Sequence, residues 1–88
     1  MPRPLIPLLA TLCTACIPQD QSSVCAEYVS CIQARDARDG TTTDLVRFTP
    51  EGDCWSIDAG ADLCTRGCEA GLEYLRSHES NLPAECNP

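Results

Sequence analysis

Apolar residues recur at three- and four-residue spacing in a segment that follows Ser22 and Ser23 and reaches about Arg38. This is the spacing of one face of an α-helix, so the segment predicts an amphipathic helix. Either serine can cap its start, and Asp39-Gly40 ends it. The inward stripe is expected to comprise Cys25, Tyr28, Val29 and Ile32, with Cys31 on its flank.

A second segment of the same periodicity predicts another long helix, roughly Ala59 to His78. Ser56 or Asp58 can cap its start. Arg76, like the histidine at its end, suits the negative end of the helix dipole. The expected inward stripe of this helix is Ala61, Cys64, Cys68, Leu72 and Leu75.

The connection between the two helices contains a short apolar piece, Leu45 to Phe48. We expect a helical turn there, capped by Thr43 or Asp44, although alternation of apolar and polar residues leaves a strand open. After the second helix, the tail from Asn81 to Cys86 is expected to fold back. The predicted fold is mainly α: a small disulfide-stapled antiparallel helical hairpin with a short third helix in the connection.

The first residues have a different pattern, with Arg3 followed by an apolar stretch from Leu5 to Ala15. That stretch is far shorter than the roughly 20 residues of a membrane-spanning helix, and Pro7 interrupts it. Charge, short apolar core and small residues before Cys16 are typical of a cleavable export signal. We therefore divide the chain into a signal peptide (1–15), a lipidated Cys16 with a polar tether (16–23) and a disulfide-rich helical domain (24–88).

Cysteine parity favours lipidation of Cys16 over plain secretion. The chain has eight cysteines, and cleavage before Cys16 removes Cys13. If Cys16 carries lipid, such as palmitate, the remaining cysteines are even in number and can all pair in an oxidising compartment. They are Cys25, Cys31, Cys54, Cys64, Cys68 and Cys86.

Sequence alone cannot choose among the possible pairings, but an antiparallel hairpin offers a preference. It places the start of the first helix near the tail, and the middles of the two helices together. The tentative nested set is 25–86, 31–68 and 54–64. The main rival set is 25–68, 31–64 and 54–86.

Thirteen acidic residues against six arginines give the chain a net charge of −7, which opposes binding to nucleic acid. The acidity is spread along the chain and predicts a solvated surface. On the second helix, Asp62 with Arg66 and Glu73 with Arg76 have the spacing of exposed ion pairs.

No catalytic residue, metal site or cofactor is predicted. A zinc site or a redox enzyme would need a close Cys-x-x-Cys pair, but the closest domain pair is Cys64-x3-Cys68. His78 is the only histidine and lies at a predicted helix end. The stretch 36–44 faintly resembles a calcium-binding loop. When Gly40 is aligned with the glycine of such a loop, Arg35 and Val46 fall at positions that need oxygen ligands, so the match fails. We therefore expect a protein that is not an enzyme.

The cysteine spacing from Cys25 to Cys86 resembles that of small cysteine-rich bacterial lipoproteins. Thr14-Ala15-Cys16 also resembles the lipobox, although Cys13 stands where a leucine-like residue is usual. The resemblance implies a helical domain and no particular activity. The motifs that carry it are Cys25-x2-Tyr28-x2-Cys31, Gly52-x-Cys54-Trp55, Cys64-x3-Cys68, Gly71-Leu72 and Pro83-x2-Cys86.

The leading functional hypothesis is a lipid-anchored, non-enzymatic binding or structural module in the bacterial cell envelope. It would lie on the outer side of the cytoplasmic membrane or on the outer membrane. Its partners would be the membrane, through the lipid anchor, and a protein or envelope component. The alternative is a secreted small inhibitor or toxin-like effector, for which a rigid disulfide-rich scaffold is equally suited.

Overall fold

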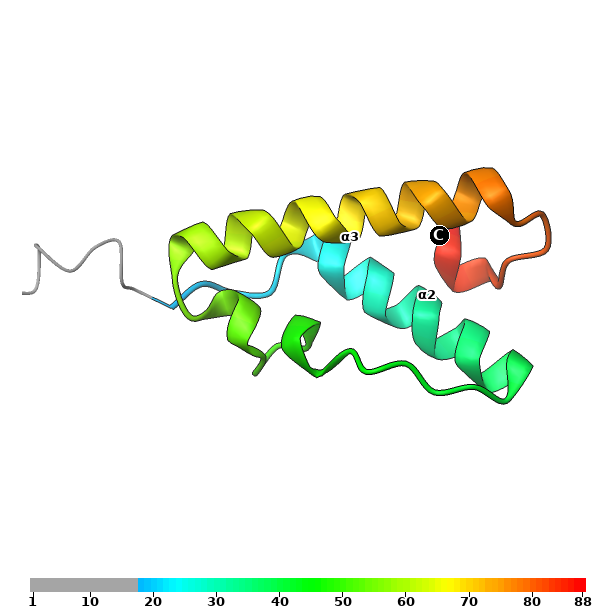
Figure 1. The fold of residues 1–88 in the computed structure, drawn as a ribbon, viewed down its shortest axis with the longest axis horizontal. Helices are drawn as coiled ribbons and strands as arrows, with labels where there is room; N and C mark the ends of the chain where they lie inside the picture. Colours follow the sequence, from blue (N-terminus) through cyan, green and yellow to red (C-terminus); the bar gives the residue numbers. More distant parts are fainter. Residues whose placement is uncertain (1–17) are drawn as a thin grey trace, which may run out of the picture.

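The structure, a computed structural model, describes residues 18–88, which form helices and loops without a strand (Figure 1). Two long helices dominate, α2 (Ser23–Asp39) and α3 (Asp58–His78). Three short 3-10 turns complete the fold: η2 (Val46–Phe48) and η3 (Asp53–Trp55) in the connection, and η4 (Ala84–Cys86) in the tail. The mainly α fold with a short helical element in the connection is therefore confirmed. The predicted signal peptide and Cys16 lie outside the described residues.

The helix α2 begins and ends at the capping residues that the sequence predicts, whereas α3 does not begin with the predicted cap. The Ser22 hydroxyl accepts a hydrogen bond from the Cys25 N–H at 3.4 Å, and Gly40 ends the helix in the left-handed conformation (φ 70°). The N-cap of α3 is Ile57, which has no capping side chain. The prediction of a Ser56 or Asp58 cap was wrong, because Asp58 is already the first helical residue.

The two helices run in the same direction, so the predicted antiparallel arrangement is wrong. In an antiparallel pair, the sequence separation of facing residues falls steadily along the helix. Here it does not fall: it is 43, 43 and 44 residues in three contacts spread along the helices, and both helices run in the same direction in Figure 1. The contacts that set this register are Ser22–Thr65, Cys25–Cys68 and Arg35–Glu79.

The connection makes the parallel arrangement possible because it runs back along the whole of α2 (Figure 1). A helix of 17 residues is about 25 Å long at 1.5 Å per residue. The connection, residues 40–57, is long enough to cover that distance. At the start of α2, the Gln21 side-chain amide donates to the Phe48 carbonyl at 2.8 Å. The chain is thereby returned to the beginning of α2 before α3 starts.

Cysteine side chains form much of the core. Five of the eleven buried apolar residues among residues 18–88 are cysteines, including Cys31, which is fully buried and not on the flank. One cluster packs the helices against the tail, and the other packs the start of α2 against η3 and α3. The buried apolar residues are Cys25, Val29, Cys31, Ile32, Leu45, Cys54, Trp55, Cys68, Leu72, Leu75 and Cys86.

The three disulfides follow from the parallel arrangement: Cys25–Cys68, Cys31–Cys86 and Cys54–Cys64. The predicted 54–64 bridge is confirmed, because it depends only on local proximity. The predicted 25–86 and 31–68 bridges were wrong, because parallel helices bring the start of α2 to the middle of α3. The tail then folds back to the middle of α2. Of the rival set, 25–68 is present and 31–64 and 54–86 are not.

Of the two ion pairs predicted on α3, one is present and the other is replaced by a contact between the helices. Arg66 and Asp62 form the expected i,i+4 pair at 3.1 Å. Arg76 does not pair with its predicted partner on α3 but crosses to α2, where it lies 2.6 Å from Glu27. The same guanidinium donates to the Cys86 carbonyl at 2.7 Å. Arg76 thus joins both helices and the tail.

Disulfide mapping of the unreduced protein tests the corrected pairing. Trypsin and a glutamyl endopeptidase together cut after Glu27, between Cys25 and Cys31, and after Arg66 and Glu69, on either side of Cys68. We expect the Cys25 peptide to be linked to the peptide 67–69, and the Cys31 peptide to be linked to the Cys86 peptide. The reverse linkage in the mass spectrum would contradict parallel helices.

Two glycines of α3 form a matched pair for a stability test. A Cβ at Gly71 would lie 2.7 Å from the Tyr28 ring, which packs edge-on against Phe48, whereas a Cβ at Gly67 meets nothing within 4 Å. Gly67→Ala should stabilise the fold by about 0.5–1 kcal/mol through helix propensity. Gly71→Ala should destabilise it by about 1–3 kcal/mol through overpacking. Urea unfolding with the disulfides intact measures both, and equal effects would contradict the close Tyr28 contact.

Candidate functional site

All six cysteines between residues 18 and 88 are in disulfides, so this part of the chain holds no free thiol. Within the same residues, no group of three His, Cys, Asp or Glu side chains could hold a metal ion. His78 stacks on Tyr74, with ring centroids 4.0 Å apart, at the exposed end of α3. The predicted disulfide residues are thus placed in structural bridges, and the histidine in a local ring contact.

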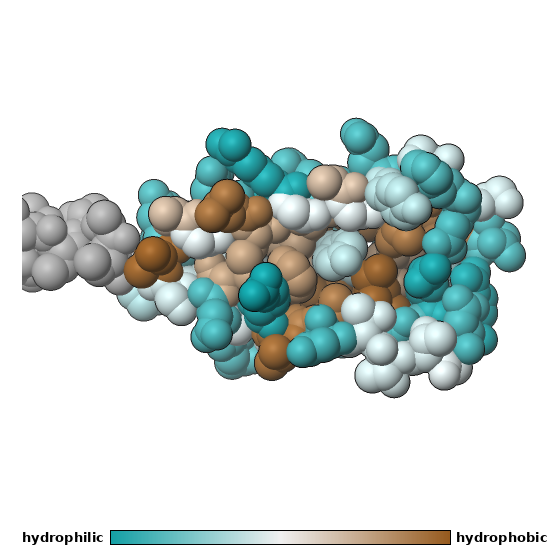
Figure 2. All heavy atoms as spheres, viewed as in Figure 1, coloured by the Kyte–Doolittle hydropathy of each residue, from teal (hydrophilic) through white to brown (hydrophobic). Residues whose placement is uncertain are grey.

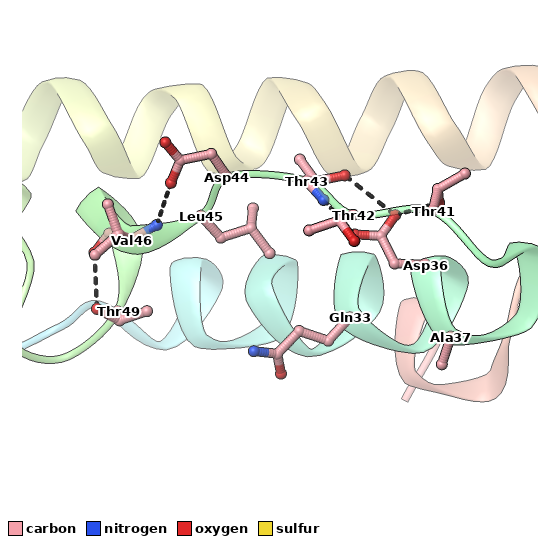
Figure 3. Close-up of a pocket in the computed structure, with 10 residues that line it drawn as sticks. All are labelled: Gln33, Asp36, Ala37, Thr41, Thr42, Thr43, Asp44, Leu45, Val46 and Thr49. Atoms are coloured by element: carbon pink, nitrogen blue, oxygen red, sulfur yellow. Dashed lines mark hydrogen bonds between the residues drawn. The ribbon is translucent and has the colours of Figure 1, made fainter.

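A hollow of about 830 Å³ lies where the connection passes over the end of α2 (Figure 3). Asp36 lies in its wall and accepts three hydrogen bonds from the loop. The Thr41 hydroxyl donates at 2.7 Å, the Thr43 N–H at 2.8 Å and the Thr43 hydroxyl at 3.1 Å. Figure 3 shows this carboxylate on α2 turned toward both threonines. Asp36 therefore fastens the returning connection to α2.

These bonds also alter the acidity of Asp36. The Thr41 hydroxyl, and then Thr43, lower the pKa of Asp36 below its ordinary value of 3.8. A carboxyl with a lowered pKa in the folded state stabilises the fold above about its unfolded pKa, and this contribution is lost as the pH falls through the lowered pKa. The Asp36 carboxylate is therefore ionised at neutral pH, where it accepts the hydrogen bonds that hold the loop.

A second hollow, of about 420 Å³, lies between α2 and α3 beside Val24 and Leu72. Its charged wall includes Glu27 and Arg76, which are paired with each other. Toward the carboxyl ends of the two helices, the Arg35 guanidinium donates two hydrogen bonds, of 3.0 and 2.7 Å, to the Glu79 carboxylate. These bonds raise the pKa of Arg35. These charged groups hold the helices together. The hollow keeps an open, partly apolar surface, and Glu69 and Glu73 give its rim an acidic excess.

The end of the domain where the chain enters is the feature that the sequence did not reveal. We call it the entry end and define it as residues 18–22, η3, Ile57 and the first turns of α3. The Gln19 N–H donates to the Trp55 carbonyl at 2.6 Å, and Gln21 is bonded to Phe48. Residues 19–22, predicted to be part of a free tether, are therefore packed on the domain, which begins before residue 24.

Exposed aliphatic side chains gather toward the same end (Figure 2). Among residues 18–88, the large ones are Val46, Ile57 and Leu63, which are 69%, 46% and 70% exposed. Leu63 shares a hollow with Cys54 of η3. Helical periodicity left Leu63 out of the inward stripe of α3 but gave no placement for Val46 and Ile57, which lie outside the two long helices.

The three disulfides indicate an oxidising compartment outside the cytoplasm, or secretion. No helix within residues 18–88 is both long and apolar enough to cross a membrane. The structure thus supports the predicted oxidising location at this coarse level.

The role of Asp36 is tested by removing one hydroxyl at a time. Thr41→Val should raise the pKa of Asp36 toward 3.8, because it removes the largest cause of the lowered value. Thr42→Val is the matched control, since Thr42 lies in the same loop and makes no bond to Asp36. The pH titration of the Asp36 carboxyl carbon by NMR measures both variants. An unchanged pKa in Thr41→Val would show that the loop is held in another way.

The chain was compared with protein families, curated proteins and solved structures. No protein-family model, no curated protein and no solved structure matches the chain.

Proposed function

We propose that this protein is a lipid-anchored, extracytoplasmic module of the bacterial cell envelope that binds a partner or has a structural role, without enzymatic activity. One observation carries the proposal. All six cysteines after Cys16 are consumed by three bridges within the domain. Once Cys13 is removed with the signal, Cys16 is the one cysteine left over, and acylation gives it a use in an oxidising compartment.

The chemistry of the described surface supports binding in preference to catalysis. Of the charged side chains that line the hollows of about 830 and 420 Å³, Asp36, Glu27 and Arg76 are engaged in bonds that hold the fold together, and Glu69 and Glu73 remain on the rim of the second. What they leave is a rigid, open and partly apolar surface, which suits contact with a protein or an envelope component. The net charge of −7 disfavours nucleic acid as that partner.

A lipid anchor also fits the size of the domain. Two or more acyl chains attach a protein to a membrane stably, so no protein surface is needed to hold the module there. The domain is then free to present its own surface to a partner. A secreted inhibitor or toxin-like effector is the alternative, and in that case Cys16 would carry no acyl chain.

The intact mass of the mature protein tests the proposal. We expect a polypeptide that starts at Cys16 and carries acyl chains, and whose mass rises by about 6 Da on reduction, because each bridge gains two hydrogens. Cys16→Ser should carry no acyl mass. Cys13→Leu is the matched control and should mature like the wild type, because it places the usual residue at that lipobox position and leaves with the signal.

Two results would contradict this proposal. A mature wild-type chain that starts at Cys16 without acyl mass would favour the secreted alternative. A full-length chain with reduced cysteines would exclude export altogether.

A further inference from the structure

The packing of residues 18–22 fixes where a lipid anchor would attach to the domain. Gln19 is hydrogen-bonded to Trp55, and Pro18 lines a shallow hollow together with Gly52 and Trp55. The chain therefore joins the folded domain at η3, next to the start of α3 (Figure 1). Gln19 is bonded to the last residue of η3 and Gln21 to the last residue of η2. These two contacts hold the segment on the domain, so it does not act as a spacer.

The covalent distance from the anchor to the domain is short. Only one residue separates Cys16 from Pro18. Two residues of fully extended chain span at most about 7 Å, whatever conformation they adopt. If the acyl chains on Cys16 are in a bilayer, the entry end must therefore lie at the headgroups.

The entry end carries side chains suited to that position. Ile57 directly precedes α3 and Leu63 lies in its second turn, and both are exposed. Val46 adds a third exposed aliphatic side chain from η2, which packs against η3. Exposed aliphatic groups that reach the boundary between headgroups and acyl chains gain from the burial of their apolar area.

We propose that the entry end of the domain contacts the lipid surface, with Ile57 and Leu63 entering the headgroup region and the Tyr74 end of α3 held away from the membrane. This inference rests on the proposed lipid anchor and adds the orientation of the domain. The partner-binding surface is then the part of the domain that points away from the bilayer.

Charge at the entry end explains why the contact depends on the anchor. Asp20, Asp53 and Asp58 belong to the entry end, and Glu51 and Arg47 line the hollows beside it. This acidic excess is repelled by anionic headgroups within about one Debye length, roughly 10 Å. The anchor overcomes the repulsion by holding Ile57 and Leu63 at a high effective concentration beside the lipid.

Two tryptophan variants on α3 test the orientation. The mature protein, as processed by the bacterium that expresses it, is reconstituted into phosphatidylcholine vesicles that contain bromine-labelled phosphatidylcholine, which quenches tryptophan on contact. Leu63→Trp places the probe near the entry end, and Tyr74→Trp is the matched control, 60% exposed and about 16 Å further along the same helix. Trp55 is buried and common to both.

The expected result is that Leu63→Trp loses most of its added fluorescence in brominated vesicles, whereas Tyr74→Trp keeps its own. Ile57→Trp should behave like Leu63→Trp. Because these side chains are exposed, the variants should keep the three bridges and the helical circular dichroism of the wild type. Flotation with the vesicles is measured on the same samples.

Flotation separates the two ways in which this inference can fail. If the variants float but Leu63→Trp is quenched no more than Tyr74→Trp, the anchor stands and the orientation is overturned. If the wild type does not float, the lipid anchor itself is wrong, and the orientation fails with it.

Discussion

The bridge between Cys25 and Cys68 is the constraint on which the arrangement of this domain depends. It joins the first turn of α2 to the middle of α3, in the same register as the Ser22–Thr65 hydrogen bond. A domain this small obtains only about 3–5 kcal/mol from an apolar core, whereas a disulfide contributes typically about 2–4 kcal/mol. With cysteines forming nearly half of the buried apolar residues, the bridges are both the covalent links and much of the packing.

The helices themselves were predictable because their information is local. The periodicity of 23–39, its serine cap and Gly40 all act within a turn or two of the backbone. The Cys54–Cys64 bridge was predictable for the same reason, since its cysteines are only 10 residues apart. Local rules failed at the start of α3, where Ile57 takes the cap position without a capping side chain, and for Arg76, which pairs with Glu27 across the helices.

The direction of α3 was not predictable, because a long connection permits either direction. A short loop forces two helices to run antiparallel, but residues 40–57 can either turn at once or return along α2. The choice is made by contacts between the connection and the segment at α2, such as those of Asp36 with Thr41 and Thr43 just after the helix. The contact of Gln21 with Phe48 spans 27 residues and lies beyond the reach of local patterns. Two glutamines in a polar stretch look like a spacer in the sequence, so the entry end could not be foreseen either.

The partner of Cys31 has a consequence for the order in which the bridges can form. A chain that emerges from a membrane with its amino-terminal side first exposes Cys25 and Cys31 before Cys68 and Cys86, and the Cys31 partner lies 55 residues further on. Any bridge that an oxidant makes between the two early cysteines is non-native and must later be exchanged through a mixed disulfide. Maturation of the fold is thus tied to disulfide isomerisation, on a timescale of seconds to hours set by the local oxidant and isomerase.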